Sequence, residues 1–140
     1  MADPIDVLSM ALDRAARVRP AVGGFPYLAE VLRDSGFDHV RCDVAGGTML
    51  YRGPVGAVVT RGPGQVAATA TVPPWDQAAL VAAIRADQRG ERTFPEFLAG
   101  CWSAGVTDYD VDLIGRACTY RSADPGRRYV EEYAAVAVPA

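Results

Sequence analysis

The sequence predicts an α+β fold in which residues 1–140 form a single domain built from two similar halves. The stretch 94–121 aligns without a gap on the stretch 25–52, which lies 69 residues earlier. Within each stretch the spacing of apolar residues changes from helical to strand-like. A chain of 140 residues also buries roughly 70% of its unfolded surface on folding, so neither a metal nor a disulfide is needed for a core.

The aligned stretches keep their landmark residues at matching positions. These are Phe25 and Phe94, Gly36 and Gly105, Asp43 and Asp112, Gly46 and Gly115, and the closing Tyr51-Arg52 and Tyr120-Arg121. Two units of this size cannot each bury a sheet face alone, so we expect them to share one core with pseudo-twofold symmetry. The predicted repeats cover about 4–72 and 74–138.

Each element of the first half follows from local pattern. Ile5, Leu8 and Leu12 recur at helical spacing, and a second helix ends at the left-handed cap Gly36. Alternation in Val40-Arg41-Cys42 then indicates strands. The predicted elements are helices 5–18 and 26–35 and strands 40–44, 48–52 and 55–60, with a fourth strand at 65–72.

The second half repeats this programme. An alanine-rich helix is predicted from Asp76 and a shorter one from Phe94, and Gly115-Arg116 is predicted to form a two-residue hairpin turn. The predicted elements are helices 76–88 and 94–104 and strands 108–114, 117–122 and 128–138.

Charge and hydropathy exclude several classes of function. The net charge is −3 and no stripe of Lys and Arg is present, so no nucleic-acid partner is expected. No segment approaches the ~20 apolar residues of a membrane helix. Asp3 and Asp6 stand where a signal peptide would carry positive charge, so we expect a cytoplasmic protein.

No metal or cofactor is predicted. Cys42, Cys101 and Cys118 align in the other half with plain hydrophobic residues, as expected of buried structural thiols. A zinc site needs about four ligands at defined spacing, and His39 is the only histidine. The glycines match neither a dinucleotide-binding nor a Walker motif.

The candidate site rests on matched Asp–Arg pairs. A turn at Gly115-Arg116 pairs residue 112 with 119 and 110 with 121, which places Asp112 diagonal to Arg121. Asp43 is likewise expected diagonal to Arg52, within reach of long side chains. Exposed pairs of this kind contribute about 0–1 kcal/mol. If the face is covered, each pair would instead anchor an anionic or carbonyl-bearing ligand.

Other side chains complete the hypothesis. His39 is either a solvated residue at a strand end or a general base at the mouth of a cleft. Tyr51, Tyr109, Tyr120 and Trp102 are either core aromatics or the lining of a cavity between the halves.

The residues also resemble a known family. Phe94-Pro95, Tyr109, Val111-Asp112, Cys118-Thr119-Tyr120 and the strand Val130 to Glu132 look like the bacterial DUF1398 domain, often labelled YbcV-like or phage-envelope protein. The resemblance covers nearly the whole chain and is stronger in the second half. It implies a small bacterial α+β protein and carries over no catalytic residues.

Two functions from different classes follow. The first is a small-molecule-binding protein, extending to an acid–base enzyme of isomerase, cyclase or lyase type that needs no metal or cofactor and acts between the repeats. Its catalytic candidates are Asp112, His39 and Asp43, and its substrate-binding candidates are Arg121, Tyr120, Arg52, Tyr51, Tyr109 and Trp102. The alternative is an interaction module, a homodimer or adaptor of prophage origin, in which the long last strand pairs by its edge.

Overall fold

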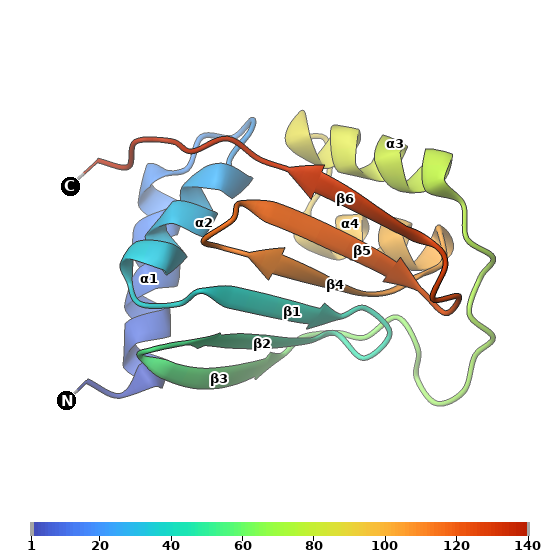
Figure 1. Ribbon diagram of the computed structural model, residues 1–140, viewed down its shortest axis with the longest axis horizontal. Coiled ribbons are helices and arrows are strands. Elements are labelled where there is room, and N and C mark those ends of the chain that lie inside the picture. Colours follow the sequence, from blue (N-terminus) through green and yellow to red (C-terminus); the bar gives the residue numbers. More distant parts are fainter. Residues whose placement is uncertain (1, 140) are drawn as a thin grey trace.

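The computed structural model describes residues 2–139 and places four helices and one six-stranded antiparallel sheet within them (Figure 1). In chain order the elements are α1 (Pro4–Val18), α2 (Phe25–Asp34), β1 (His39–Asp43), β2 (Thr48–Gly53), β3 (Gly56–Arg61), α3 (Gln77–Gln88), α4 (Phe94–Ser103), β4 (Val106–Asp112), β5 (Ala117–Ser122) and β6 (Arg128–Glu132). The prediction of an α+β fold is confirmed.

Local capping signals fix where the helices begin. The Asp3 side chain accepts a hydrogen bond from the backbone N–H of Ile5 at 2.9 Å, ahead of a proline in the first turn of α1. At α4, Thr93 and Glu96 form a capping box, in which each side chain accepts from the other's backbone N–H at 3.3 and 2.9 Å. The first turns of both helices therefore have acceptors for their free N–H groups.

The two halves meet at the centre of the sheet, whose strand order is β3-β2-β1-β4-β5-β6. β1 and β4 pair antiparallel there, with His39 opposite Asp112 and Arg41 opposite Asp110. From either edge towards the centre, the third, second and first strand of one half follow each other. The helices do not follow this symmetry, because α1 runs across the strands while α3 runs along them (Figure 1). Duplication of an ancestral unit stays a prediction.

The helices pack on one face of the sheet and leave the other open. Buried strand residues such as Val40, Cys42 and Val111 alternate with residues of greater exposure, as one-sided covering requires. One cluster of buried residues draws on both halves and includes Phe37 and Leu80. We call the uncovered side, which carries the candidate site, the open face.

Two predicted strands differ from those observed. Residues 65–72 form no strand, because the Gln65 N–H bonds back to the Ala45 carbonyl at 2.8 Å, beyond the break at Gly62-Pro63-Gly64. The last strand ends at Glu132 rather than at residue 138.

The segment after β6 is packed against the fold instead of extending an edge. Tyr133 and Val138 contact the core, and Arg14 of α1 donates to the Pro139 carbonyl at 3.1 Å. The apolar end of the chain is therefore packed on the fold, while β6 itself is an edge strand that pairs with β5.

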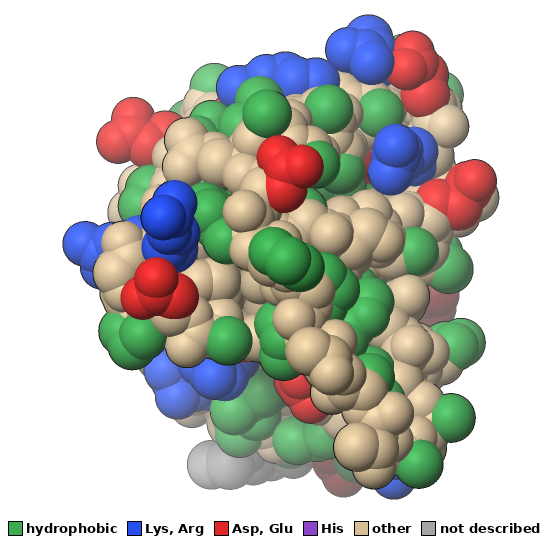
Figure 2. All heavy atoms as spheres, turned by 90° about the vertical axis from the view of Figure 1, so that its right-hand side faces the viewer, with side chains coloured by type: hydrophobic (Ala, Val, Ile, Leu, Met, Phe, Trp, Pro, Cys, Tyr) green, Lys and Arg blue, Asp and Glu red, His purple; other side chains and the backbone are tan. Residues whose placement is uncertain are grey.

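On the side of the molecule that lies at the right of Figure 1, acidic and basic side chains are not separated into distinct regions. Acidic and basic side chains are scattered there among apolar ones (Figure 2). No helix within residues 2–139 has the length and apolar character to cross a membrane.

Candidate functional site

The candidate site lies on the open face, where strand alternation places charged side chains. On β1, Val40 and Cys42 point into the core, so His39, Arg41 and Asp43 point the other way. The same alternation applies to every strand because opposed residues in an antiparallel pair share a face.

The strand register joins these side chains into three rows that cross the sheet. The His39 row contains Ala57, Arg52, His39, Asp112, Ala117 and Glu132. The Arg41 row contains Val59, Leu50, Arg41, Asp110, Thr119 and Val130. The Asp43 row contains Arg61, Thr48, Asp43, Asp108, Arg121 and Arg128. β4 thus contributes one aspartate to each row, with Arg41 of β1 opposite Asp110 and Arg121 of β5 opposite Asp108.

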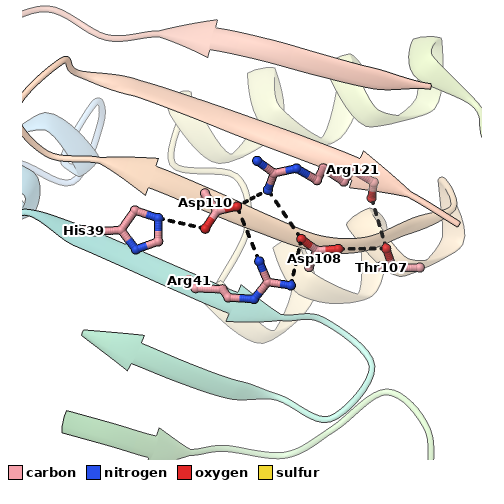
Figure 3. A network of polar contacts seen from close by, with 6 residues as sticks. All are labelled: His39, Arg41, Thr107, Asp108, Asp110 and Arg121. Carbon is pink, nitrogen blue, oxygen red and sulfur yellow. Dashed lines mark hydrogen bonds and ion pairs between the residues drawn. The ribbon is translucent and has the colours of Figure 1, made fainter. Parts of the chain in front are cut away.

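A network centred on Asp110 occupies the seam between the halves (Figure 3). His39 Nε2 lies 2.8 Å from Asp110 Oδ1. Arg121 forms an ion pair with Asp110 Oδ2, and Arg41 lies 3.6 Å from the same oxygen. Both guanidinium groups also reach Asp108 Oδ2, at 3.3 Å from Arg41 and 3.5 Å from Arg121. Two carboxylates are therefore neutralised by two arginines.

An irregularity in β4 lies next to Asp108, which strand alternation brings to this network. The pairing of β4 with β5 shifts between Val106 and Asp108, which is the position of a β-bulge. Thr107 at the bulge donates from Oγ1 to Asp108 Oδ1 at 3.0 Å (Figure 3). Asp108 consequently has both oxygens engaged, one by a hydroxyl and one by the arginines.

The surroundings of His39 favour its neutral imidazole over the charged form. Burial, followed by the positive charge of Arg52, lowers the pKa of His39 below its ordinary value, while Asp38 and Asp112 oppose the shift. Geometry supports this direction, because Nδ1 is buried and has no hydrogen-bond partner among the described residues. A proton on Nδ1 would be a buried donor without an acceptor.

The pKa of His39 predicts how stability depends on pH. Because the folded-state pKa lies below the unfolded value of about 6.5, the contribution of His39 is fully present above that pH and is lost as pH falls through the folded-state pKa. We expect the urea midpoint to fall from pH 7.5 to pH 5.5, and His39→Gln to remove this slope. A midpoint that rises on acidification would show that Asp110 favours the imidazolium.

A concave pocket of about 410 Å³ opens beside the network. Its walls come from both halves: His39, Arg41, Arg52, Asp110, Asp112, Ala117, Thr119 and Arg121. Within residues 2–139, Arg52 forms no ion pair and no side-chain hydrogen bond, and it is exposed. Arg52 is thus the lining arginine that has no ion-pair partner among the described residues.

The predicted register of the second hairpin is wrong by two residues. Asp112 pairs with Ala117 and Asp108 with Arg121, so the turn contains four residues rather than two. Arg121 consequently meets Asp110 and Asp108, and not Asp112. Asp112 instead stabilises the turn, where its Oδ1 accepts from the backbone N–H groups of residues 114 and 115 at 3.0 and 2.8 Å. Asp112 still lines the pocket.

The first hairpin shows the same correction. Asp43 pairs with Thr48, and Arg52 pairs with His39, so the predicted Asp43–Arg52 couple does not form. Asp43 does not line the pocket but lines a separate small hollow. Of the three catalytic candidates, the structure brings His39 and Asp112 to the pocket and leaves Asp43 outside it.

The aromatic candidates lie on the covered side of the sheet. Tyr51, Tyr109 and Tyr120 are buried in the core, and Phe97 of α4 packs edge-on against the latter two. Trp102 is part of α4 and packs against the same core. All four are substrate-binding candidates for which the sequence also allows a core role. None lines the pocket, because their strand parity or helix face directs them into the core.

Four residues of the site were missed by the sequence interpretation: Arg41, Asp108, Asp110 and Thr119. All follow the alternation that already placed Asp112 on this face, so the run of aspartates at every second position of β4 was the available signal. Their partners could not be seen because β1 meets β4 only through the tertiary fold.

Other reactive groups are enclosed. Burial raises the pKa of Cys42 to about 11 and that of Cys118 to about 12, and it raises the pKa of Cys101 further. In the part of the chain that the structure describes, no three His, Cys, Asp or Glu residues are grouped to hold a metal ion. The chemistry of the site is thus that of guanidinium, carboxylate, imidazole and hydroxyl groups.

No family model matches the chain. Similar proteins are Uncharacterized protein Rv2012 of Mycobacterium tuberculosis (strain ATCC 25618 / H37Rv), Uncharacterized protein MT2067 of Mycobacterium tuberculosis (strain CDC 1551 / Oshkosh) and Uncharacterized protein Mb2035 of Mycobacterium bovis (strain ATCC BAA-935 / AF2122/97). Each is 43% identical over 136 residues, which cover 97% of this chain and 82% of the relative. The chain belongs to the same family as these mycobacterial proteins.

Proposed function

We propose that the protein binds a small anionic molecule in the pocket of the open face, with Arg52 as the main contact. The observation that carries this proposal is the difference between Arg52 and the other arginines of the pocket. Arg41 and Arg121 are engaged by Asp108 and Asp110, whereas the guanidinium of Arg52 is exposed at the same pocket. Guanidinium groups bind carboxylate and phosphate oxygens through paired N–H donors.

The pairing of charges at the pocket favours an anion over a cation at Arg52. Asp108 and Asp110 contact Arg41 and Arg121, and Asp112 is bound to its own turn, so Arg52 is the lining arginine whose guanidinium is left to meet a ligand. The Thr119 hydroxyl supplies a further donor or acceptor at the floor. The network around Asp110 supports the pocket by holding the neighbouring side chains in place, which reduces the entropy cost of binding.

The geometry supports binding more than turnover. A general base must reach the proton it removes, but His39 Nε2 faces Asp110 and Nδ1 is buried. The carboxylate of Asp112 is engaged by its own turn. Acid–base catalysis without metal or cofactor therefore stays a hypothesis that needs a rearrangement of His39.

The interaction module stays the alternative proposal, because β6 is an edge strand of the sheet, although the apolar residues after it pack on the fold. We retain the resemblance to the DUF1398 family as a proposal. It is compatible with this function, since it assigns no activity of its own.

We expect Arg52→Gln to weaken anion binding at least tenfold while leaving the fold intact. The reason is that the exposed guanidinium contributes charge and hydrogen bonds to the ligand but none to other described side chains. The measurement is a titration with inorganic phosphate at constant ionic strength, followed through backbone amide shifts near His39 and Thr119.

Arg61→Gln is the matched control. Arg61 is exposed on the same face but belongs to the Asp43 row and does not line the pocket. Equal loss of phosphate binding in the two variants would contradict the proposal, because it would indicate a diffuse attraction to surface charge.

A further inference from the structure

A second hollow adjoins the pocket on the open face. It measures about 100 Å³ and is lined by Arg41, Asp43, Thr48, Met49, Leu50 and Val59. Arg41 lines both cavities. The two hollows are therefore neighbours separated by one side chain.

Apolar side chains are presented at this second hollow. Val59 is 63% exposed although it is a strand residue of the sheet, and it lies directly opposite the half-buried Leu50. Cross-strand partners of this kind form one continuous surface. Burial of such a surface by a ligand is favourable in proportion to the area removed from water.

The anionic contact and the apolar surface lie on one strand. Arg52 and Leu50 are two residues apart on β2 and share the open face, which places their backbones about 7 Å apart. The stem of Arg41 offers further apolar surface between the hollows, because long charged side chains keep their methylene groups along such surfaces. A ligand of modest length can contact all three side chains.

We propose that the ligand is a monoanion with a compact apolar body, such as an aryl or alkyl carboxylate. Its carboxylate pairs with Arg52, and its body covers Leu50 and Val59. This inference rests on the function proposed above and adds the class of ligand.

The distribution of charge selects a monoanion. Arg52 is the one lining arginine without an ion pair among residues 2–139, and Asp43 lines the apolar hollow. A second anionic group placed there would meet a carboxylate instead of a guanidinium, and like charges at close range repel. Polyphosphates and dicarboxylates therefore fit less well than a single carboxylate with a hydrocarbon body.

The experiment compares acetate with phenylacetate by amide-shift titration of the full chain. We expect phenylacetate to bind at least tenfold more tightly than acetate, with shifts at Arg52, Leu50 and Val59. Val59→Thr keeps the branched shape but replaces a methyl group by a hydroxyl, and we expect it to reduce this advantage threefold or more. Its unchanged amide spectrum elsewhere verifies the fold.

Val130→Thr is the matched control. Val130 lies in the same row at the opposite edge, is 49% exposed and lines neither hollow, so the advantage of phenylacetate is expected to persist. Equal affinity for acetate and phenylacetate, with both lost in Arg52→Gln, would overturn the ligand class and leave the binding function standing. No binding of acetate, phenylacetate or phosphate at Arg52 would overturn both. An equal effect of the two threonine variants would overturn the apolar subsite.

Discussion

Replacing Gly53 with alanine is expected to destabilise the protein by about 3 kcal/mol or more, a lowering of Tm by about 10 °C for a chain of this size. A Cβ atom at this position would overlap the Gly36 carbonyl oxygen and lie 2.7 Å from the Phe37 Cα. Both contacts are with backbone, which cannot rotate away as a side chain can. The measurement is urea or thermal unfolding followed by far-UV circular dichroism.

The same substitution tests how the site is positioned. Gly53 follows Arg52, whose carbonyl accepts from the Asp38 N–H at 2.9 Å, so a shift there displaces the proposed anion contact. Gly62→Ala is the control, since its Cβ would meet nothing closer than the Gly47 carbonyl oxygen at 3.7 Å. Near-equal unfolding midpoints for the two variants would show that the end of β2 is not tightly packed.

The second large effect is expected at Glu30, where alanine should lower the free energy of unfolding by about 2 kcal/mol. Glu30 of α2 is a buried charged residue, with 9% of its side chain exposed, and its Oε1 accepts from Arg116 Nε at 2.6 Å. Removing the carboxylate leaves a partly buried guanidinium in the β4–β5 turn without its partner. The contact also joins the two halves, so its loss loosens their packing.

A short exposed ion pair provides the contrast for Glu30. Arg89 and Glu91 form three hydrogen bonds of 2.9–3.0 Å, but their side chains are 60% and 53% exposed. Solvent screens such a pair, so Glu91→Ala should leave the unfolding midpoint unchanged. A larger effect at Glu91 than at Glu30 would contradict the view that burial decides the cost.

Much of the fold follows from local rules that the sequence displays. Helix starts follow from caps such as Thr93, and the face of each strand follows from alternation. The predicted hairpin registers were displaced by two residues, and a displacement by two keeps every side chain on its face. The charged face was therefore predicted correctly, while the partners of Asp43 and Asp112 were wrong.

The site itself depends on information that the sequence does not display. The number of residues in a hairpin turn sets which residues of its two strands pair. The dipeptides Gly46-Gly47 and Gly115-Arg116 suggest two-residue turns, whereas four residues form each turn in the structure. The contact of His39 with Asp110 arises only when β1 pairs with β4, more than sixty residues later in the chain. Tyr51 and Tyr120 occupy matching positions in the two halves, which made them candidates for substrate binding. The positions match because each half places an aromatic residue in the core.

The burial of the three cysteine thiols determines how readily they react with oxidants. Cys42 and Cys118 lie on the helix-covered side of the sheet and Cys101 on α4, and none is exposed. Thiolate is the species that reacts with peroxides and electrophiles, and burial suppresses it at all three positions. The three thiols are thereby shielded from oxidants in the native fold, and their chemistry begins only when the sheet and helices come apart.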